Sequence, residues 1–382
     1  MARPLKKQGE LSPLSPRILS ASEKLDWLRL IQTENVGPIS FYQLLKRFRS
    51  AGEALRHMHK LSRQSSRHHF ALKTPSKESV ERLYERYNKE GVELIACVEP
   101  AYPALLKHLE DAPPLISVAG NVGLLSRDLF SVVGSRNASA LGREIAFSMT
   151  KRLSEEGLVI VSGLAEGIDT AAHNASLETG TVAVVAGGVD HVYPPQNKGL
   201  YEQIRAHGVL VSESFLGVEP QARLFPRRNR LISGMSWGLL VVEAAFQSGS
   251  LITAHYAAEQ GRQVFAVPGH PSDARAKGVN KLIQEGALLA EKAEDILAAR
   301  RQIGIEEDAF DFTLEGGEDR GEFSSLQPVC ERVKDLLTAA PTTLGTLQEV
   351  SRLDPALLRA AILELVLLGE AEEYPGGAFV AR

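Results

Sequence analysis

The 382-residue sequence has few cysteines, the residues that cross-link small domains and hold structural zinc. Its two cysteines, Cys97 and Cys330, lie far apart and outside any CxxC or Cys/His cluster. This spacing indicates neither zinc nor a disulfide framework, and we expect no cofactor. No apolar run approaches the ~20 residues of a membrane helix, and the first residues lack the apolar core of a signal peptide. We therefore expect a cytoplasmic protein without membrane contacts.

The sequence also lacks an overall excess of positive charge, because the formal net charge is −4. Taken alone, this balance argues against nucleic acid as a ligand. The charges are unevenly distributed, however. Residues 1–95 hold 18 Lys and Arg against 10 Asp and Glu, whereas residues 306–322 hold eight acids and one Arg. Such asymmetry indicates partners better than the total charge does, so nucleic acid remains a possible ligand.

Between Phe130 and Gly269 one pattern occurs five times, namely a short apolar run that ends at Gly or Ser. The five runs begin at Ser131, Val159, Val182, Leu239 and Val264. β-Branched runs of this length, followed by helical patterns, are typical of buried parallel strands. The sequence thus predicts an α/β fold with an open, doubly wound parallel sheet. Ligands of such sheets bind at the carboxyl ends of the strands, where Gly/Ser turns offer N–H groups to phosphates.

Composition divides the rest of the chain into segments. The predicted segments are a disordered start (1–20), a helical domain that is SAM-like or helix-hairpin-helix-like (21–90), the α/β domain (91–300), an acidic linker (301–326) and a tail (327–382).

Two of these segments resemble DNA-binding modules. The turn at Asn35-Val36-Gly37-Pro38 resembles that of helix-hairpin-helix modules, although a plain helical turn is the preferred interpretation of a single copy. Three helical patterns and a hairpin in the tail predict a winged helix. Its third helix offers only Arg359 as a basic residue, and the tail holds five basic against eight acidic residues. We therefore expect a protein-binding or structural role for the tail.

Residues at the ends of the predicted strands form the candidate phosphate site. These candidates are Gly134, Ser135 and Arg136; Ser162, Gly163 and Gly167; Lys198; and Ser248, Gly249 and Ser250. The most basic short segment supplies four more, which are Arg227, Arg228, Asn229 and Arg230. A solvated side chain is an equal alternative at Lys198, and Ser248 or Ser250 could cap a helix. Guanidinium groups and free N–H groups at strand ends favour a phosphate-bearing ligand.

Asp169 and His173 lie four residues apart on a predicted helix, close enough to pair on one face. A catalytic dyad would need a nucleophile or a metal beside it, and the sequence indicates neither. We expect both residues to be structural, either by pairing or by fixing the adjacent loop.

Six segments taken together closely resemble the DNA-processing protein A family (DprA, also called Smf). They are VGSR, SGLAEGIDTAAH, GGVDHVYPPQN, FPRRNRLISG, EAAFQSGSLITA and VFAVPGH, in this order. The resemblance implies an extended Rossmann-like domain that forms a homodimer, binds single-stranded DNA and loads a RecA-type recombinase during natural transformation. It also implies that Arg136 and Lys198 contact phosphates of the bound strand and that Arg227–Arg230 extend this row of phosphate contacts.

The related nucleotide-phosphoribohydrolase fold provides an alternative, in which the chain would be a nucleotide-processing enzyme. Those enzymes carry a PGGxGTxxE turn with a catalytic Glu, and this chain has QSGSLITA where a comparable turn precedes a helix. The sequence therefore predicts a DNA-binding protein rather than an enzyme.

Overall fold

The computed structural model describes residues 14–64, 73–303, 327–338, 340–367, 369–374 and 378–381. The chain separates into two compact units, one of Met1–Glu81 with Asp311–Arg382 and the other of Arg82–Phe310. Across these described ranges, no helix is both long enough and apolar enough to cross a bilayer. The predicted disordered start and acidic linker lie mostly outside the described residues.

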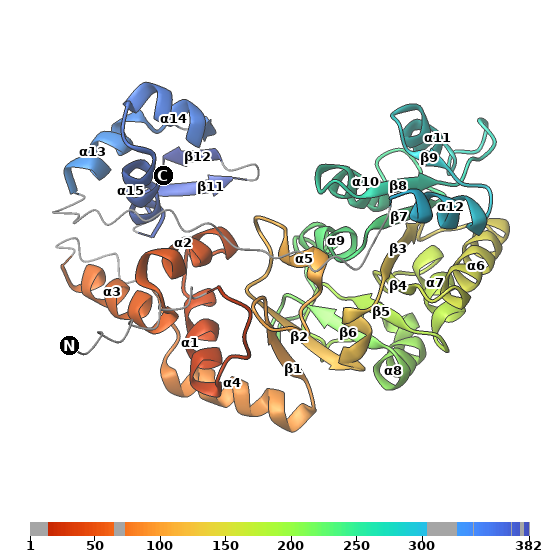
Figure 1. Cartoon of the computed structure of the whole chain (residues 1–382), viewed down its shortest axis with the longest axis horizontal. Coiled ribbons are helices and arrows are strands. Elements are labelled where there is room, and N and C mark those ends of the chain that lie inside the picture. Colours follow the sequence, from red (N-terminus) through yellow and green to blue (C-terminus); the bar gives the residue numbers. More distant parts are fainter. Residues whose placement is uncertain are drawn as a thin grey trace, which may run out of the picture. The chain divides into compact units, whose positions relative to one another are not determined.

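A nine-stranded sheet forms the centre of the larger unit, in the order β1-β2-β6-β5-β4-β3-β7-β8-β9 (Figure 1). Its strands are β1 (Glu93–Ala96), β2 (Leu115–Gly120), β3 (Leu129–Gly134), β4 (Val159–Ser162), β5 (Thr181–Val184), β6 (Val209–Ser212), β7 (Gly238–Val242), β8 (Gln263–Ala266) and β9 (Leu288–Leu289). Neighbours from β6 to β9 are parallel, whereas β1 pairs antiparallel with β2, and β2 with β6. The predicted α/β fold is confirmed, and the five predicted runs are β3, β4, β5, β7 and β8.

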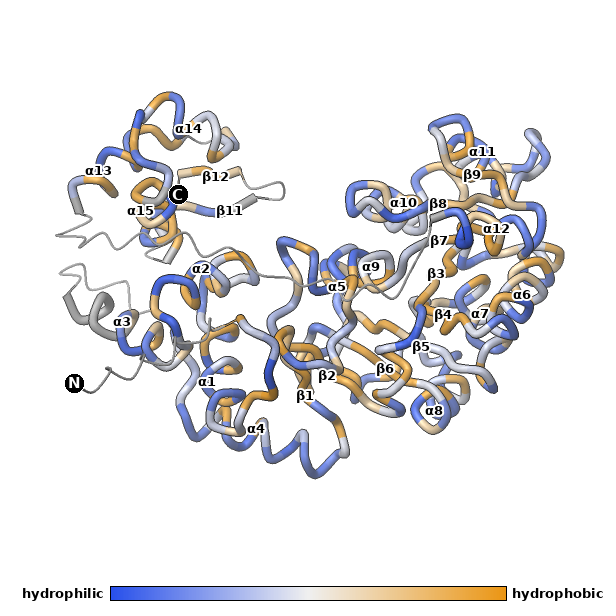
Figure 2. Tube along the Cα trace, viewed as in Figure 1, coloured by the Kyte–Doolittle hydropathy of each residue, from blue (hydrophilic) through white to orange (hydrophobic). Residues whose placement is uncertain are grey.

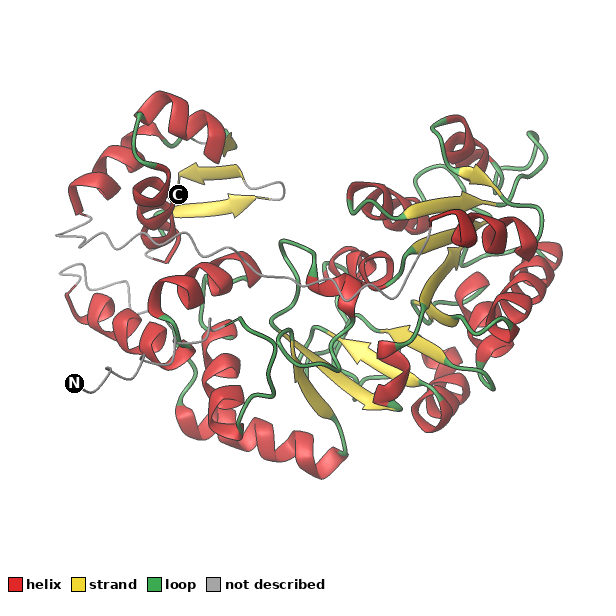
Figure 3. Cartoon of the chain, in the orientation of Figure 1, coloured by secondary structure: helices red, strands yellow, loops and turns green. Residues whose placement is uncertain are grey.

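Helices cover both faces of this sheet (Figure 3). Those of the unit are α5 (Ala104–Lys107), α6 (Ala140–Glu155), α7 (Ile168–Ser176), α8 (Lys198–His207), α9 (Leu224–Met235), α10 (Gly249–Glu259), α11 (Lys277–Gln284) and α12 (Ala293–Ile303), with short 3₁₀ turns η1 (Val122–Ser126) and η2 (Pro195–Asn197). Alternation along β3 separates the two layers. Phe130 and Val132 join the core under α6, α7 and α12, whereas the Ser131 hydroxyl donates to the Ile232 carbonyl of α9 at 2.7 Å.

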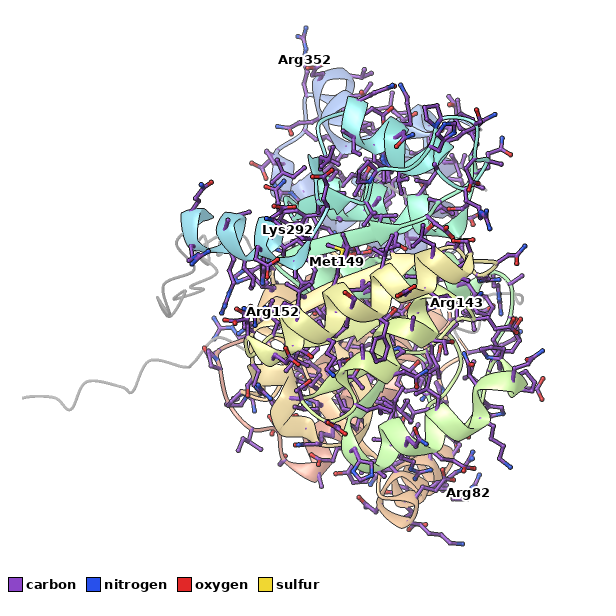
Figure 4. The ribbon with its side chains drawn as sticks, turned by 90° about the vertical axis from the view of Figure 1, so that its right-hand side faces the viewer. Arg82, Arg143, Met149, Arg152, Lys292 and Arg352 are labelled. Atoms are coloured by element: carbon purple, nitrogen blue, oxygen red, sulfur yellow. The ribbon has the colours of Figure 1, made fainter. Side chains whose placement is uncertain are left out.

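Three large rings fill the core beneath α6. The centroids of Phe130 and Trp237 lie 5.0 Å apart, and those of Trp237 and Phe265 lie 6.2 Å apart at 89°. Such tilted pairs contribute about 0.5–1.5 kcal/mol beyond the area they bury. The central strands are apolar (Figure 2), and Figure 4 looks onto α6, with Arg143 and Arg152 toward its two ends.

The smaller unit begins with a helical segment of α1 (Ala21–Ile31), α2 (Pro38–Phe48) and α3 (Ala51–Gln64), and α4 (Lys77–Glu90) leads from it into the larger unit. Ser20 starts α1 through a capping box with Glu23. Trp27 packs edge-on against Phe41 with centroids 5.0 Å apart. Asn35 takes a positive φ of 65° and Pro38 occupies the first turn of α2, so the predicted tight turn is present.

The tail consists of α13 (Gln327–Leu336), α14 (Leu344–Ser351) and α15 (Pro355–Leu367) with a sheet ordered β10-β12-β11. These strands are β10 (Thr342–Thr343), β11 (Ala371–Tyr374) and β12 (Ala378–Ala381). Helices and hairpin occur where the sequence predicts them, and the assignment as a winged helix stays a prediction. Within the same unit, the Arg47 Nη2 lies 3.2 Å from the Glu364 Oε1 of α15.

Candidate functional site

The order of the strands sets where a ligand can bind. From β3 the chain proceeds through β4 and β5 to β6, and it then returns to place β7 on the other side of β3. The loop after β3 therefore leads to β4 on one side, and the loop after β7 leads to β8 on the other. In open parallel sheets this switch point opens a crevice at the carboxyl ends of the strands. The site should lie near the turns that follow β3 and β7.

The crevice between β3 and β7 is occupied by a carboxylate of the protein itself. Glu243, at the end of β7, accepts a hydrogen bond from the Ser139 N–H at 2.8 Å and another from the Ser139 hydroxyl. Ser139 caps the start of α6, so the negative charge lies where the helix dipole favours an anion. Glu243 takes a φ of 51°, and a Cβ at Gly142 would lie 2.4 Å from its carboxyl carbon. A phosphate at this helix terminus would be repelled.

Two backbone N–H groups of the turn after β4 are also hydrogen-bonded within the chain. Asp169 Oδ2 accepts from the N–H groups of Gly163 and Ala165, each at 3.2 Å. A Cβ at Gly167, whose φ is 80°, would lie 2.3 Å from the Ser135 carbonyl oxygen. Gly134 is required for the same reason, because its Cβ would lie 1.9 Å from the Val242 carbonyl oxygen. These glycines permit close backbone approach, so the predicted row of free N–H groups is only partly present.

An open hollow of about 150 Å³ lies over the ends of β4 and β5. It is lined by Arg136, Gly163, Ala165, Glu166, Val185, Ala186, Gly187, His191, Tyr193, Pro194, Pro220, Phe225 and Arg228. Of the predicted contacts, Arg136, Gly163 and Arg228 come together here. This volume is below the ~300–1,000 Å³ of small-molecule pockets, so the hollow suits one unit of a longer ligand.

Arg228 is the central charge of the hollow. Its side chain is buried, with the residue 5% exposed, and its Nη1 donates to the Val184 carbonyl at 2.8 Å. Its Nε has no partner among the described residues. Burial lowers the pKa of the Arg228 guanidinium to about 10; the charge of Asp169 raises it, and that of Arg136 lowers it further. An anion between the two arginines would relieve their repulsion.

Aromatic rings form the outer wall. Phe225 lies in the first turn of α9, and its ring centroid is 5.3 Å from that of Tyr193. The guanidinium carbons of Arg136 and Arg228 lie 5.6 Å and 5.9 Å from the centroid of Phe225. Tyr193 is exposed, whereas Phe225 is half-buried. The hollow thus combines a buried and an exposed cation with exposed ring surface.

Several predicted contacts lie outside the hollow. Arg230 is buried and ion-paired with Glu213 and with Asp111, the latter at 3.3 Å. Arg227 is exposed and lies 3.5 Å from Glu213. Lys198 is exposed at the start of α8, with its Nζ 4.0 Å from Glu202. Glu213, which directly follows β6, thus pairs with two of the predicted arginines outside the hollow.

The remaining candidates serve the scaffold or lie farther along the edge. The hydroxyl of Ser162 is buried and donates to the Val132 carbonyl at 2.7 Å. The hydroxyls of Ser248 and Ser250 lie 2.6 Å apart, and neither caps α10 by a hydrogen bond. Asn229 donates through Nδ2 to the Gly249 carbonyl at 3.2 Å, which ties α9 to the start of α10.

Asp169 and His173 do not bond to each other. Asp169 fixes the loop, as one of the two alternatives predicts, and burial raises its pKa while Arg228 opposes the rise. His173 lies fully buried with its Nδ1 2.7 Å from the Thr181 hydroxyl oxygen, and burial followed by the charge of Arg228 lowers its pKa to about 3. His173 is therefore neutral and structural at physiological pH.

Sequence reasoning missed the aromatic wall. Tyr193 and Phe225 each stand beside a proline in a polar loop or a basic segment, and that neighbourhood was the available signal. Neither ring could be placed without knowing that the loop of Tyr193 meets the first turn of α9. Within the described ranges, no cluster of three or more His, Cys, Asp or Glu side chains could hold a metal ion.

Residues 93–301 match the family model described as DNA recombination-mediator protein A. Residues 21–83 match the model described as a DprA-like N-terminal HHH domain. The second match confirms the predicted helix-hairpin-helix-like N-terminal domain, and at Asn35–Pro38 it favours the helix-hairpin-helix over a plain helical turn.

Known proteins show the same similarity. DNA processing protein DprA of Bacillus subtilis is 44% identical over 218 residues, covering 56% of this chain and 73% of the relative. Protein Smf of Synechocystis is 32% identical over 405 residues, covering 95% and 100%. The X-ray structure of DNA processing protein A from Streptococcus pneumoniae aligns with a TM-score of 0.58 at 33% identity, covering 74% of this chain and 98% of that chain.

Proposed function

Because this chain belongs to the DNA recombination-mediator protein A family, we propose that it binds single-stranded DNA at the hollow beside Arg228 and acts as a recombination mediator. The observation that carries the proposal is the juxtaposition of Arg136 and Arg228 with the rings of Tyr193 and Phe225. Guanidinium groups bind phosphate, and aromatic rings stack on bases of any identity. The predicted outcome is sequence-tolerant binding of single strands.

The chemistry of the wall explains a preference for single strands. In a duplex the faces of the bases are stacked on one another, so no base is free to meet Tyr193 or Phe225. A single strand can place a phosphate between the arginines and turn its base onto the rings. The hollow is too small for more than one such unit, so further contacts must come from its surroundings.

We further propose that the chain loads a RecA-type recombinase onto the bound strand during natural transformation, as its family resemblance implies. A homodimer through the Rossmann-like domain forms part of this proposal. The two-residue strand β9 supports it, because Leu288 and Leu289 are exposed at the free edge of the sheet. The contact between Arg47 and Glu364 supports a structural role for the tail.

A binding assay at several salt concentrations tests the proposal. Fluorescence anisotropy should show tighter binding of a labelled single strand than of the matching duplex. The logarithm of affinity should fall with that of salt by ~0.7 per neutralised phosphate. Equal affinity for the two forms would contradict it. Pure protein should release no base from nucleoside monophosphates, and release would favour the phosphoribohydrolase alternative.

Arg136→Ala tests the site itself. Loss of a charge-assisted contact should weaken single-strand binding by about 1.5–3 kcal/mol without lowering the melting temperature, because Arg136 is exposed. Lys198→Ala should have a smaller effect, since Lys198 lies outside the hollow beside Glu202. Arg152 lies in the last turn of α6, whereas Arg136 precedes that helix (Figure 4 labels Arg152). Arg152→Ala is the matched control and should leave affinity unchanged. A variant that lost stability and affinity in parallel would show Arg136 to be structural.

A further inference from the structure

The turn between β7 and α10 exposes an aromatic side chain. Phe246 is 69% exposed, more than Phe147 at 41% or Tyr193 at 43%. Burying such a ring would contribute about 1.5–3 kcal/mol, so the exposed position forgoes stabilisation that the fold could otherwise gain. Phe246 follows a parallel strand and therefore lies at the same edge of the sheet as the hollow.

The backbone holds Phe246 in this position. The Ser248 N–H donates to the Ala245 carbonyl at 3.1 Å, and the Ala244 N–H donates to the Arg275 carbonyl at 2.7 Å. Gln247 takes a φ of 66°, and Glu243 is anchored to Ser139. Residues on both sides of the ring are thus fixed, so a ligand need not order the turn before stacking on it.

The turn lies next to the wall of the hollow. β7 is the neighbour of β3, which leads to Arg136, and strands of a sheet lie about 4.8 Å apart. α9, which carries Phe225 and Arg228, lies next to α10 (Figure 1). Its Asn229 donates to the Gly249 carbonyl in the first residue of α10. The path from the hollow to Phe246 therefore runs past Arg136 and crosses the ends of β3 and β7.

We infer that a bound single strand leaves the hollow past Arg136 and stacks a second base on Phe246. This inference rests on the proposed function and adds a direction to it. Along this path the carboxylate of Glu243 repels phosphates from the crevice, so a contact through a base is favoured over one through the backbone. The occupant is nucleic acid because the path is continuous with the hollow and any base has a face that can stack.

Oligonucleotide length separates the two contacts. Anisotropy is measured with labelled oligothymidylates of about 4–16 nucleotides, the range that single-strand sites cover. The shortest oligomers fill only the hollow, and longer ones also reach Phe246. Phe246→Ala should leave affinity for the shortest oligomers unchanged and weaken the longest by about five- to tenfold. Phe246→Tyr should restore the loss, whereas Phe246→Leu, which lacks a π-face, should not.

Phe147→Ala is the matched control, because it removes another exposed phenyl ring from the same unit and should change nothing. Unchanged affinity of Phe246→Ala at every length would overturn the inference and leave the proposed function standing. An equal loss at every length would also overturn it, since Phe246 would then act on the hollow or the fold. The inference would likewise be overturned if Phe246→Ala altered only self-association or recombinase loading and left single-strand affinity unchanged. Failure of the unmodified protein to bind any oligomer would overturn the proposed function, and the inference with it.

Discussion

Two parts of the same sheet edge carry side chains of opposite charge. At the ends of β4 and β5 Arg228 is buried beneath an open hollow, and its Nε has no partner in the part of the chain that the structure describes. At the ends of β3 and β7 a carboxylate, that of Glu243, is hydrogen-bonded to the start of α6. Both parts have the same sequence pattern, which is an apolar run, a Gly/Ser turn and a helix. The first, here called the open part, offers a cation to a ligand. The second, here called the closed part, already binds the Glu243 carboxylate.

The difference shows that a Gly/Ser turn at a strand end does not by itself indicate a phosphate site. Its N–H groups are available only where no carboxylate of the chain accepts from them. Asp169 takes two of them after β4, and Glu243 takes one before α6. Around the hollow, the side chains of Arg136 and Arg228 supply the positive charge for a ligand. Whether a turn can bind phosphate therefore depends on whether a carboxylate side chain of the protein accepts hydrogen bonds from the N–H groups of that turn.

The largest expected effect comes from removing the cation of the open part. Arg228→Met should abolish detectable single-strand binding and reduce the free energy of unfolding by about 3 kcal/mol, because Asp169 would remain buried without its neighbouring charge. Denaturant unfolding measures the second effect. Adding Asp169→Asn should recover much of the stability but none of the binding. Unaltered stability of Arg228→Met would show that the two charges are not coupled.

A smaller effect should come from His173, which lies beneath the same part of the edge. Its folded pKa of about 3 is below the ordinary 6.5, so the unfolded chain takes up a proton that the folded chain refuses. Stability should consequently fall as pH drops below 6.5, by about 2 kcal/mol between pH 7 and pH 5. Unfolding curves across this range, compared with those of His173→Gln, measure the contribution. An identical pH dependence in the variant would contradict it.

Exchanging the charge at the closed part should have a still smaller effect. Glu243→Gln keeps a hydrogen-bond acceptor for Ser139 but removes the negative charge from the start of α6, which should cost about 0.5–1 kcal/mol of stability. Affinity for long single strands should rise slightly, because a repelling charge beside their path is lost. Anisotropy at low salt measures the change. Weaker binding by this variant would show that the Glu243 carboxylate orders the binding site rather than repelling phosphates from it.

The smallest effect is expected away from the edge. A chain that ends at Gln302 lacks the acidic tail, whose net charge of −3 does not attract DNA. Its single-strand affinity should stay within about twofold of the full chain. A tenfold loss, about 1.4 kcal/mol, would show that the tail binds DNA or organises an assembly that does.

The fold was largely predictable because buried parallel strands leave an unmistakable apolar pattern. β3, β4, β5, β7 and β8 were predicted as strands from such runs. The antiparallel pairing of β2 with β6 was not, because it depends on which strand lies next to which. The family resemblance supplied the layout that the pattern alone left open.

The site was predictable only in part. Arg136, Gly163 and Arg228 were correctly expected to meet at one edge. Arg230 was expected beside them, yet helix periodicity turns it inward, where Glu213 and Asp111 pair with it. A basic run in the sequence cannot show which of its members a helix will bury. The wall of Tyr193 and Phe225 joins a loop to the first turn of α9, 32 positions apart in the sequence, and only the folded chain brings them together.

The two tryptophans are distributed one to each compact unit. Trp27 is buried against Phe41 in the smaller unit, and Trp237 is buried between Phe130 and Phe265 in the larger one. Since the chain has no other tryptophan, Trp27→Phe leaves an emission that reports on the sheet alone, and Trp237→Phe leaves one that reports on the helical segment alone. The protein thus contains its own pair of optical probes, from which the cooperativity between its halves can be read.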